Sequence, residues 1–492
     1  MAGLSSCARR NPAEGLIDRS SVSSSTGSRV FADRLTIRPL NGRHDEKGDP
    51  DMSFTRRDFI GAGAGAGIGL AGSSLRLAAA AESTRIVTLG EWLRADRDGR
   101  KRGLKECLQR IQELEPSIHA WVQVQPDSTG TNGPLAGIPF GAKDIIETKG
   151  MATEYGSPAY KGRVGTEDAE IIRQLRNSGA LLLGKTVTTA FALLTPGPTR
   201  NPRDLAHTAG GSSSGSAAAV AADMVPFTVG EQTRGSIIRP ASFCGVTGFK
   251  PTHGLLPMQG VLVISRSLDT LGFFTHKPED MLALWQALGY PAGHDEQLTY
   301  GVPDPMPECD PEMANAFRQS VASLRRSGID IKPIDIAEML EKLGQANFTL
   351  QSYEGARAHQ ARVAELGDRL DQALIELVRN GLQISASEYE AARRYIADCR
   401  TKMAALFRST PVILTPAAVG QAPLGLSTTG DPRMNAPWTA LGTPAISIPM
   451  PIATGLPLGL QLTADVGQDA RLLRAAVQLQ ERLDAGPKVS LV

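Results

Sequence analysis

Hydrophobic residues recur along this chain with two spacings, one typical of helices and one typical of strands. Residues 89–114 carry leucines and charges at helical spacing and stop before Pro116, and residues 168–178 show the same spacing and stop before Gly179. The apolar runs between such segments have the length and composition of buried strands, and they lie at 118–124, within 134–144, and at 180–186, 225–229, 412–414, 445–448 and 458–462. Helices that alternate with buried strands predict an α/β layered fold with a mixed sheet.

Three further helical segments differ in character. Residues 214–224 are nearly all small, which predicts a helix that packs closely against other backbone. Residues 469–483 predict a terminal amphipathic helix. Residues 290–410 form the most helical and most charged part of the chain and contain few glycines, so we expect a helical insertion or lid over the sheet.

The N-terminal part of the chain is predicted to lie outside the fold. Residues 1–51 are polar and rich in Ser, Arg and Gly, which indicates a disordered segment or sequence upstream of a start at Met52. Within residues 52–82, Arg56 and Arg57 precede a weakly apolar Gly/Ala-rich stretch that ends in small residues. This pattern predicts a twin-arginine signal peptide, a periplasmic or secreted location, and a mature domain at 83–492.

A transmembrane anchor is the alternative explanation of that apolar stretch. Its six glycines between Gly61 and Gly72 make it a poor spanning helix, and no second apolar run long enough to cross a bilayer follows. We therefore expect no stable membrane insertion.

Composition argues against several kinds of partner. The chain carries 52 basic and 51 acidic residues, for a net charge of +1, and no basic run interleaved with aromatic residues, so we expect no nucleic-acid partner. The five cysteines are widely spread and form neither a CxxC motif nor a metal-ligand spacing with histidine. They predict free thiols and no metal site.

Two serines and one lysine carry the candidate chemistry. Ser212 lies in the glycine- and serine-rich run 210–220, and Ser236 follows 24 residues later, after Gly235. Lys143 lies between apolar segments, 69 residues before Ser212. A serine nucleophile needs a base within hydrogen-bond reach, and a lysine serves as that base only where burial lowers its pKa. These residues predict a serine hydrolase whose base is an amine.

Each of these features has an alternative explanation. Lys143 would also fit a structural ion pair with Asp144 or with any nearby acid, and the run 210–220 would also fit a loop that caps the next helix. A phosphate-binding loop is disfavoured, because the run does not end in Gly-Lys-Ser or Gly-Lys-Thr. We interpret His207, just before the run, as structural, since Lys143 is the better base.

Further motifs lie between residues 137 and 252. They are Gly-Ile-Pro-Phe-Gly-Ala-Lys-Asp at 137–144, Gly-Lys-Thr at 184–186, Asn-Pro at 201–202, the run 210–220, Gly-Ser at 235–236 and Cys-Gly-Val-Thr-Gly-Phe-Lys-Pro-Thr at 244–252. Together they resemble the amidase signature family, over essentially the whole mature chain. The resemblance implies a large mixed β-sheet core flanked by α-helices on both faces, and chemistry that needs no metal or organic cofactor.

The resemblance also implies roles for individual residues. Ser236 corresponds to the nucleophile, Ser212 to a serine after a cis peptide bond that relays the proton, and Lys143 to the terminal base. The oxyanion hole corresponds to the backbone N–H groups of Thr233, Arg234, Gly235 and Ser236. A non-proline cis peptide costs about 3–4 kcal/mol, so the Gly211–Ser212 bond is expected to have tight surroundings.

The chain departs from the family pattern around the nucleophile. The family commonly has Thr-Asp-Thr-Gly-Gly-Ser where this chain has Glu-Gln-Thr-Arg-Gly-Ser at 231–236. Gln232 and the Ile-Ile-Arg-Pro run at 237–240 resemble a subgroup of small-acid amidases and broad amide hydrolases, in some of which this arginine holds a substrate carboxylate. Arg239 is therefore a candidate anchor, with a structural ion pair as the alternative. Arg234 would narrow the pocket or bind an anionic group, and a positive φ there would be strained.

These observations predict hydrolysis of small linear non-peptide amides, with aryl amides, carbamates and esters as further candidate substrates. A glutaminase subunit of an amidotransferase is the alternative within catalysis, and the export signal argues against it. A catalytically silent binding protein, in which Arg234 blocks the pocket, is the alternative outside catalysis. We expect the pocket to be built from the surroundings of Tyr155, the loop 195–199, the helical insertion and Trp438. The sequence leaves the natural substrate, and the choice between monomer and homodimer, open.

Overall fold

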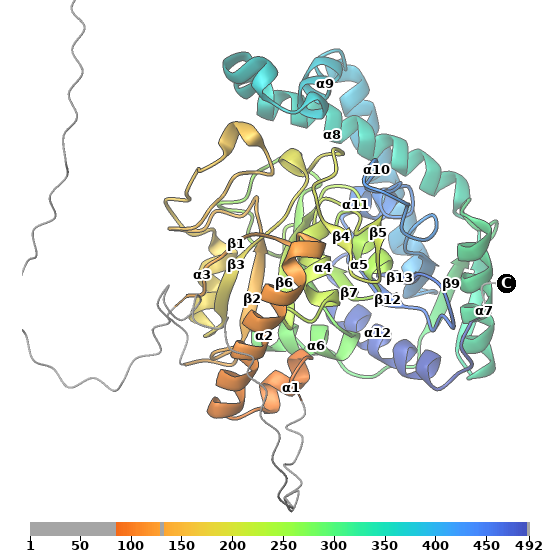
Figure 1. The fold of residues 1–492 in the computed structure, drawn as a ribbon. Coiled ribbons are helices and arrows are strands. Elements are labelled where there is room, and N and C mark those ends of the chain that lie inside the picture. Colours follow the sequence, from red (N-terminus) through yellow and green to blue (C-terminus); the bar gives the residue numbers. More distant parts are fainter. Residues whose placement is uncertain (1–84, 128–131, 490–492) are drawn as a thin grey trace, which may run out of the picture. The chain divides into compact units, whose positions relative to one another are not determined.

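A mixed β-sheet forms the centre of the structure, a computed structural model that describes residues 85–127 and 132–489 (Figure 1). The strands are β1 (Trp121–Val124), β2 (Pro139–Lys143), β3 (Leu181–Thr186), β4 (Arg200–Asn201), β5 (Asp204–Thr208), β6 (Phe227–Gln232), β7 (Thr247–Lys250), β8 (Thr270–Thr275), β9 (Thr299–Pro303), β10 (Asp330–Ile334), β11 (Val412–Pro416), β12 (Ala445–Pro449) and β13 (Gly459–Ala464). Within the described residues, 11 of them form one sheet in the order β1-β3-β2-β6-β8-β7-β12-β13-β11-β9-β10, and β4 pairs with β5. β2 is parallel to β3 and β6, and β9 is parallel to β10 and β11, while the other neighbours are antiparallel.

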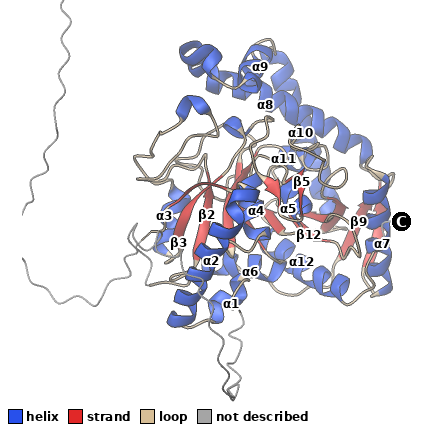
Figure 2. Cartoon of the chain, viewed as in Figure 1, coloured by secondary structure: helices blue, strands red, loops and turns tan. Residues whose placement is uncertain are grey.

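Helices surround this sheet (Figure 2). They are α1 (Leu89–Arg94), α2 (Arg97–Ile118), α3 (Glu170–Asn177), α4 (Ser214–Ala221), α5 (Ile238–Cys244), α6 (Pro278–Ala287), α7 (Pro311–Arg326), α8 (Ala337–Leu366), α9 (Gln372–Gly381), α10 (Ala386–Phe407), α11 (Ala436–Leu441) and α12 (Asp469–Asp484). Three short 3-10 helices lie at Pro158–Tyr160, Ala190–Ala192 and Gly367–Arg369. The described residues all belong to one unit, Ala64–Val492, and a second unit, Met1–Gly63, lies outside them. The predicted extension (1–51) and signal peptide (52–82) therefore also lie outside the described residues.

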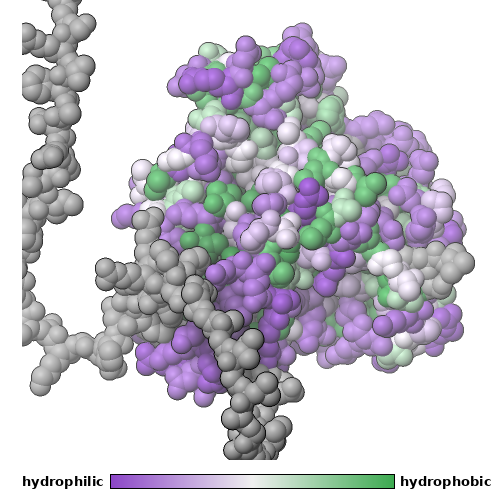
Figure 3. All heavy atoms as spheres, viewed as in Figure 1, coloured by the Kyte–Doolittle hydropathy of each residue, from purple (hydrophilic) through white to green (hydrophobic). Residues whose placement is uncertain are grey.

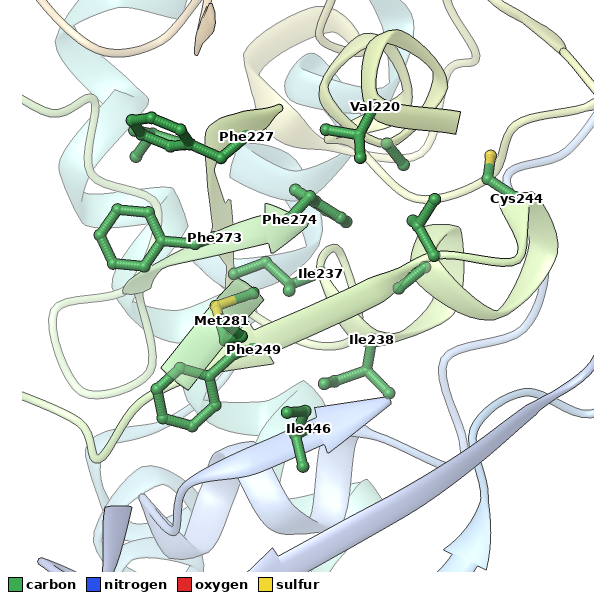
Figure 4. Close-up of a cluster of buried hydrophobic side chains, with 14 of the residues drawn as sticks. Val220, Phe227, Ile237, Ile238, Cys244, Phe249, Phe273, Phe274, Met281 and Ile446 are labelled. Carbon is green, nitrogen blue, oxygen red and sulfur yellow. The ribbon is translucent and has the colours of Figure 1, made fainter. Parts of the chain in front are cut away.

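Both faces of the sheet are covered, because the strands alternate their side chains. Figure 4 shows Phe273 and Phe274 of β8 pointing to opposite sides. Phe274 lies toward Val220 of α4, and Phe273 lies on the side of Met281 of α6. All of these side chains are buried, so the strands are apolar on both faces, as the continuous apolar runs in the sequence predicted. The predicted large mixed sheet with helices on both faces is confirmed.

The first long helix runs further than its sequence predicted. α2 continues through Pro116 to Ile118, and His119 ends it in a left-handed conformation with φ of 56°. An interior proline removes a hydrogen-bond donor and usually kinks or breaks a helix, but Pro116 lies only two residues before the end of α2. The strand expected from residue 118 accordingly begins only at Trp121.

The segment 290–410 contains strands as well as helices, so the prediction of a purely helical insertion was incomplete. β9 and β10 extend the sheet at one edge, next to β11. Their pattern is weak, because β10 is largely exposed and β9 contains Gly301 and Pro303, which are unfavourable in strands. The helical part consists of α7 to α10, of which α8, α9 and α10 lie at the top of the view in Figure 1.

The surface drawn in Figure 3 is mostly hydrophilic, with hydrophobic residues in smaller patches. In the described part of the chain, no helix combines the length and the apolar character needed to cross a membrane. The four cysteines in that part, Cys107, Cys244, Cys309 and Cys399, are free thiols, as expected.

Candidate active site

The candidate site lies where two parallel strands end at the same edge of the sheet. β2 ends at Lys143, and the neighbouring β6, in which Val229 pairs with Ala142, ends at Gln232. α4 begins just after Ser212 and packs on both strands. Ligand sites of α/β sheets usually lie at the carboxyl ends of parallel strands. The topology therefore brings Lys143, Ser212 and the turn that contains Ser236 to one edge.

Lys143 and Ser212 are in direct contact, and both are buried. The Lys143 Nζ atom lies 2.7 Å from Ser212 Oγ, 3.2 Å from the carbonyl oxygen of Glu231 and 2.9 Å from Glu231 Oε2. An ammonium group donates to all three oxygens. A neutral amine keeps two donors toward Glu231 and turns its lone pair toward the Ser212 hydroxyl. The geometry thus suits both protonation states of the lysine.

The carboxylate beside Lys143 belongs to Glu231, so Lys143 does form an ion pair with a nearby acid, as the alternative explanation allowed, but the partner is not Asp144. Asp144 points to the other side of β2, where its Oδ1 atom lies 3.4 Å from Lys185 Nζ. Burial lowers the pKa of Lys143, and the negative charge of Glu231 acts against this shift. The net direction is the one that a lysine base requires.

A second buried carboxyl group continues this chain of contacts. Thr233 Oγ1 lies 3.0 Å from Glu231 Oε1 and 2.7 Å from Asp269 Oδ1. Burial, and then the charge of Glu231, raises the pKa of Asp269 well above its usual value. Because the Thr233 hydroxyl has a single hydrogen, a proton on Asp269 supplies the second of these two hydrogen bonds. Lys143, Glu231, Thr233 and Asp269 therefore form one buried hydrogen-bonded chain.

Two glycines turn the chain into Ser212. Gly210 and Gly211 have φ values of 79° and 62°, in the left-handed region that favours glycine. The single cis peptide bond among the described residues is Asp304–Pro305, so the Gly211–Ser212 bond is trans. The cis bond that the family resemblance implied was therefore wrong for this structure. The chain turns here at two consecutive left-handed glycines.

Ser236 lies in the turn between β6 and α5, beside Gly211. A Cβ atom placed on Gly211 would be 3.3 Å from Ser236 Cα. Gln232 shapes the turn, because its Oε1 atom accepts the backbone N–H groups of Ile237 at 2.8 Å and Ile238 at 3.1 Å. The Ser236 hydroxyl forms no hydrogen bond with any residue that the structure describes. A hydrogen bond between Ser236 and Ser212 is therefore absent from this structure.

The turn presents unpaired backbone donors. The N–H groups of residues 233–236 donate no hydrogen bond to any described residue. Asn347 Nδ2 donates to Thr233 O at 3.3 Å, and Thr439 Oγ1 donates to Arg234 O at 3.0 Å. In a trans peptide the C=O and N–H groups point in opposite directions, so these contacts turn the N–H groups of Arg234 and Gly235 away from Asn347 and Thr439. Preorganised donors of this kind are what an oxyanion hole requires.

A cavity of about 900 Å³ lies beside the same turn. α8, α11 and Arg234 contribute to its wall, and Trp438 of α11 is one of its buried residues. Lys143, Ser212 and Ser236 are not among its lining residues. Arg234 is not one of the residues with positive φ, so the backbone strain considered from the sequence does not arise.

Arg239 lies beneath the turn and is fully buried. Its Nε atom donates to Thr429 O at 2.8 Å, and its Nη1 atom is buried without a partner. Burial, and then the nearby charge of Arg234, lowers the pKa of Arg239 to about 9. The alternative of a structural ion pair was wrong within the described residues, since no carboxylate there pairs with this guanidinium.

Tyr155 and the loop 195–199 lie away from the cavity that Trp438 and α8 line. The Tyr155 hydroxyl donates to Glu147 Oε1 at 2.6 Å, and its ring packs with Tyr160 and Phe191. Thr195 Oγ1 donates to Asp371 Oδ1 at 2.9 Å, which ties the loop to the start of α9. The structure therefore brings only part of the predicted pocket together.

The chain is similar to known proteins over most of its length. The sequence profile of the amidase family matches residues 103–473. The chain belongs to the amidase family. A curated relative from Acidothermus cellulolyticus, one of the subunits of glutamyl-tRNA(Gln) amidotransferase, is 30% identical over 453 residues, which span 76% of this chain and 89% of that protein.

Solved structures give the same assignment. A crystal structure of an amidase superposes with a TM-score of 0.70 at 28% identity, over 77% of this chain and 95% of that one. A structure of 6-aminohexanoate cyclic dimer hydrolase complexed with substrate superposes with a TM-score of 0.68 at 25% identity, over 80% of this chain and 95% of that one. This amidase-family chain is thus an enzyme for carbon–nitrogen bonds, as its motifs predicted.

Several residues of this amidase site were missed in the sequence. Glu231 stood out only as part of a departing motif, although a carboxylate at the end of an otherwise apolar strand is a usable signal of a buried partner. Asp269 and Asn347 carry no such signal, because Asp269 reaches the turn from just before β8 and Asn347 reaches it from α8. His207 lies on β5, where its Nδ1 atom is 3.1 Å from Asp204 Oδ2, in agreement with a structural role.

Metal ligands do not cluster in the part of the amidase that the structure describes. No group of three or more His, Cys, Asp or Glu side chains there could hold a metal ion.

Proposed function

We propose that this chain hydrolyses the C–N bond of small non-peptide amides through an acyl-enzyme on Ser236. Aryl amides, carbamates and esters are further candidate substrates of the same site. The observation that carries the proposal is the 2.7 Å contact between Lys143 Nζ and Ser212 Oγ, beside a turn with unpaired N–H groups. Tyr155, Arg239 and Trp438 remain candidate substrate-binding residues, and of these Trp438 lines the cavity.

In the first step, Ser236 Oγ attacks the amide carbonyl while its proton passes through Ser212 to neutral Lys143. The N–H groups of residues 233–236 stabilise the oxyanion, by about 3 kcal/mol per donor in comparable sites. Lys143 then returns the proton through Ser212 to the leaving nitrogen, the C–N bond breaks and the amine departs. Water attacks the resulting ester by the reverse route and releases the carboxylic acid. The relay needs a Ser236–Ser212 hydrogen bond, and such bonds often tighten only with substrate in place.

The experiment that tests this function is the intact mass of the chain after incubation with a fluorophosphonate. We expect a single adduct on the wild-type chain and none on Ser236→Ala. A panel of amides, carbamates and esters then identifies the preferred bond. The absence of an adduct on the wild-type chain would replace the proposal with a catalytically silent binding protein.

A glutaminase subunit of an amidotransferase is the second candidate, because relatives such as the Acidothermus protein carry that name. The twin-arginine signal predicted at 52–82 argues against it, since such a subunit works beside a tRNA-bound partner. Hydrolysis of amides other than glutamine by the isolated chain would favour the main proposal. Hydrolysis of glutamine alone would favour the glutaminase.

We also propose that the enzyme is exported and acts in the periplasm or outside the cell. The support comes from Arg56 and Arg57, which precede a Gly/Ala-rich apolar stretch with a small-residue cleavage site.

A further inference from the structure

Arg234 is a cation without a counter-ion among the residues that the structure describes. Its guanidinium forms no hydrogen bond or ion pair with them, and its Nε atom is buried without a partner. The ring of Phe348, whose centroid lies 5.5 Å from Arg234 Cζ, packs against it. The Thr439 hydroxyl donates a hydrogen bond to the Arg234 carbonyl, which fixes the backbone there. The guanidinium stays free to bind a ligand.

The cavity that Arg234 lines is apolar inside and acidic outside. Leu340, Met434 and Trp438 are buried residues of its wall, and Phe348 adds an aromatic ring. Glu308, Glu338 and Glu341 are exposed residues of the same lining. A ligand that fits this cavity therefore has an apolar or aromatic body, and its charged group lies next to Arg234.

The other arginine of the cavity already has partners. Arg433 Nη2 lies 2.7 Å from Asp431 Oδ2, and Arg433 Nη1 lies 3.5 Å from Glu308 Oε2. Asp431 is the carboxylate whose charge acts on both Arg234 and Arg239, and Arg433 binds it. Arg234 and Arg239 therefore carry more positive charge beside the turn than the nearby carboxylates neutralise, because Arg433 already binds Asp431.

We infer that Arg234 binds a carboxylate group of the substrate in this cavity. The inference rests on the proposed function, because it makes the cavity a subsite of the turn that carries Ser236. The substrate class is an amide that bears a carboxylate on an apolar or aromatic body. Arg234 is then a specificity residue that the general amidase reaction does not require.

A carboxylate fits this cavity better than a phosphate. One guanidinium presents a planar pair of N–H donors that matches a carboxylate in a bidentate arrangement. A phosphate dianion would be repelled more strongly by Glu308, Glu338 and Glu341 at the outside of the cavity.

The test measures equilibrium binding in Ser236→Ala, which has no nucleophile, by titration calorimetry. The probes are 3-phenylpropionate and the neutral 3-phenylpropionamide, which share an apolar body and differ in charge. We expect the acid to bind about 10- to 100-fold more tightly than the amide, as one charge-assisted hydrogen-bonded contact provides. Adding Arg234→Gln should remove this preference and leave the amide affinity unchanged, and Arg234→Lys should keep part of it.

Arg408→Gln is the matched control, because it removes the charge of an exposed arginine outside the cavity. It should keep the full preference. Equal binding of acid and amide by the Ser236→Ala chain overturns the inference. This comparison uses no substitution at Arg234, so it stays valid even if an Arg234 variant does not fold. An equal loss for both probes in Arg234→Gln, or competition by inorganic phosphate as strong as that by the acid, also overturns it. Binding is measured without turnover, so a failed fluorophosphonate reaction would reject the proposed function and leave this result standing.

Discussion

Lys143 Nζ lies 2.9 Å from Glu231 Oε2, and both side chains are shielded from solvent, with exposures of 0% and 1%. A buried carboxylate at this distance stabilises the ammonium form of the lysine, whereas the base role that we propose for Lys143 needs the neutral amine. Two opposing effects therefore set the protonation of the base. Burial lowers the pKa of Lys143, and Glu231 raises it again, so in the proposed mechanism the pH range of activity depends on Glu231, a residue outside the proton relay.

The first prediction concerns Glu231→Gln. Activity rises with pH as Lys143 loses its proton, so the acid limb of the pH profile of kcat/KM follows the lysine. Removing the carboxylate lowers the pKa of Lys143, and the limb should move about 1–3 pH units toward acid, the usual effect of one nearby opposite charge. The measurement uses an uncharged nitroanilide or ester.

Asp269→Asn is the graded comparison for that experiment. The charge of Asp269 also raises the pKa of Lys143, but by less than Glu231 does, so the acid limb should move toward acid by less than in Glu231→Gln. An unchanged limb in Glu231→Gln would mean that Lys143 is not the group that titrates.

The second prediction concerns Ser212, which lies between the lysine and the nucleophile in the proposed relay. Ser212→Ala keeps the Ser236 nucleophile and the oxyanion donors but breaks the path for the proton. We expect kcat to fall by about 10²- to 10⁴-fold, the usual contribution of general-base catalysis, with little change in KM. Slow labelling of Ser212→Ala by a fluorophosphonate should persist. A kcat close to that of the wild-type chain would remove Ser212 from the mechanism.

The sequence predicted the residues of this site better than their surroundings. Motifs identified Lys143, Ser212 and Ser236, and the structure brings two of them into contact and the third beside them. The Glu231–Thr233–Asp269 chain was not predicted, because it depends on the position of β8 next to β6. That order in the sheet is not sequential, and no local pattern in one sequence reports which strands lie side by side.

The fold shows the same division between local and long-range information. Buried strands such as β3 and β13 were predicted because their apolar runs are continuous. The edge strand β10 was not, because its residues are mostly exposed and its alternation is weak. The peptide bond before Ser212 was predicted as cis from family resemblance alone, whereas the φ values of Gly210 and Gly211 make the turn with a trans bond.

The third prediction concerns the buried pair on the opposite side of β2. Asp144 and Lys185 are both fully buried, with a 3.4 Å separation between Oδ1 and Nζ. Removing one partner leaves an uncompensated buried charge, so Lys185→Met or Asp144→Leu should lower the free energy of unfolding by about 3–5 kcal/mol. The double variant should lose less than the sum of the two losses. Urea unfolding of the wild-type chain, the two single variants and the double variant measures this coupling. Additive losses of stability would show that the two groups act independently.

The fourth prediction concerns export, and the chain offers its own control. Arg56 and Arg57 precede an apolar stretch, whereas the pair Arg9 and Arg10 does not. The full chain expressed in a bacterium with a twin-arginine pathway should reach the periplasm and begin near residue 83. Arg56→Lys with Arg57→Lys should keep it in the cytoplasm, and Arg9→Lys with Arg10→Lys should have no effect. N-terminal sequencing of the protein in the periplasmic and cytoplasmic fractions measures where the chain is and where it begins. An unmutated chain that stays full-length in the cytoplasm would contradict the prediction.

The fifth prediction separates specificity from acylation at Arg234. The guanidinium lines the cavity, while the backbone N–H belongs to the oxyanion turn, so Arg234→Gly removes the first and keeps the second. The position has no positive φ, so glycine relieves no strain there. We expect labelling by a fluorophosphonate and hydrolysis of a small neutral ester to change by less than about 3-fold, which corresponds to less than 1 kcal/mol. Hydrolysis of a nitroanilide that carries a carboxylate should fall by about 10-fold or more, the effect of one lost charge-assisted contact. Equal losses on both substrates would show that the arginine supports the turn itself, and the specificity role would then be abandoned.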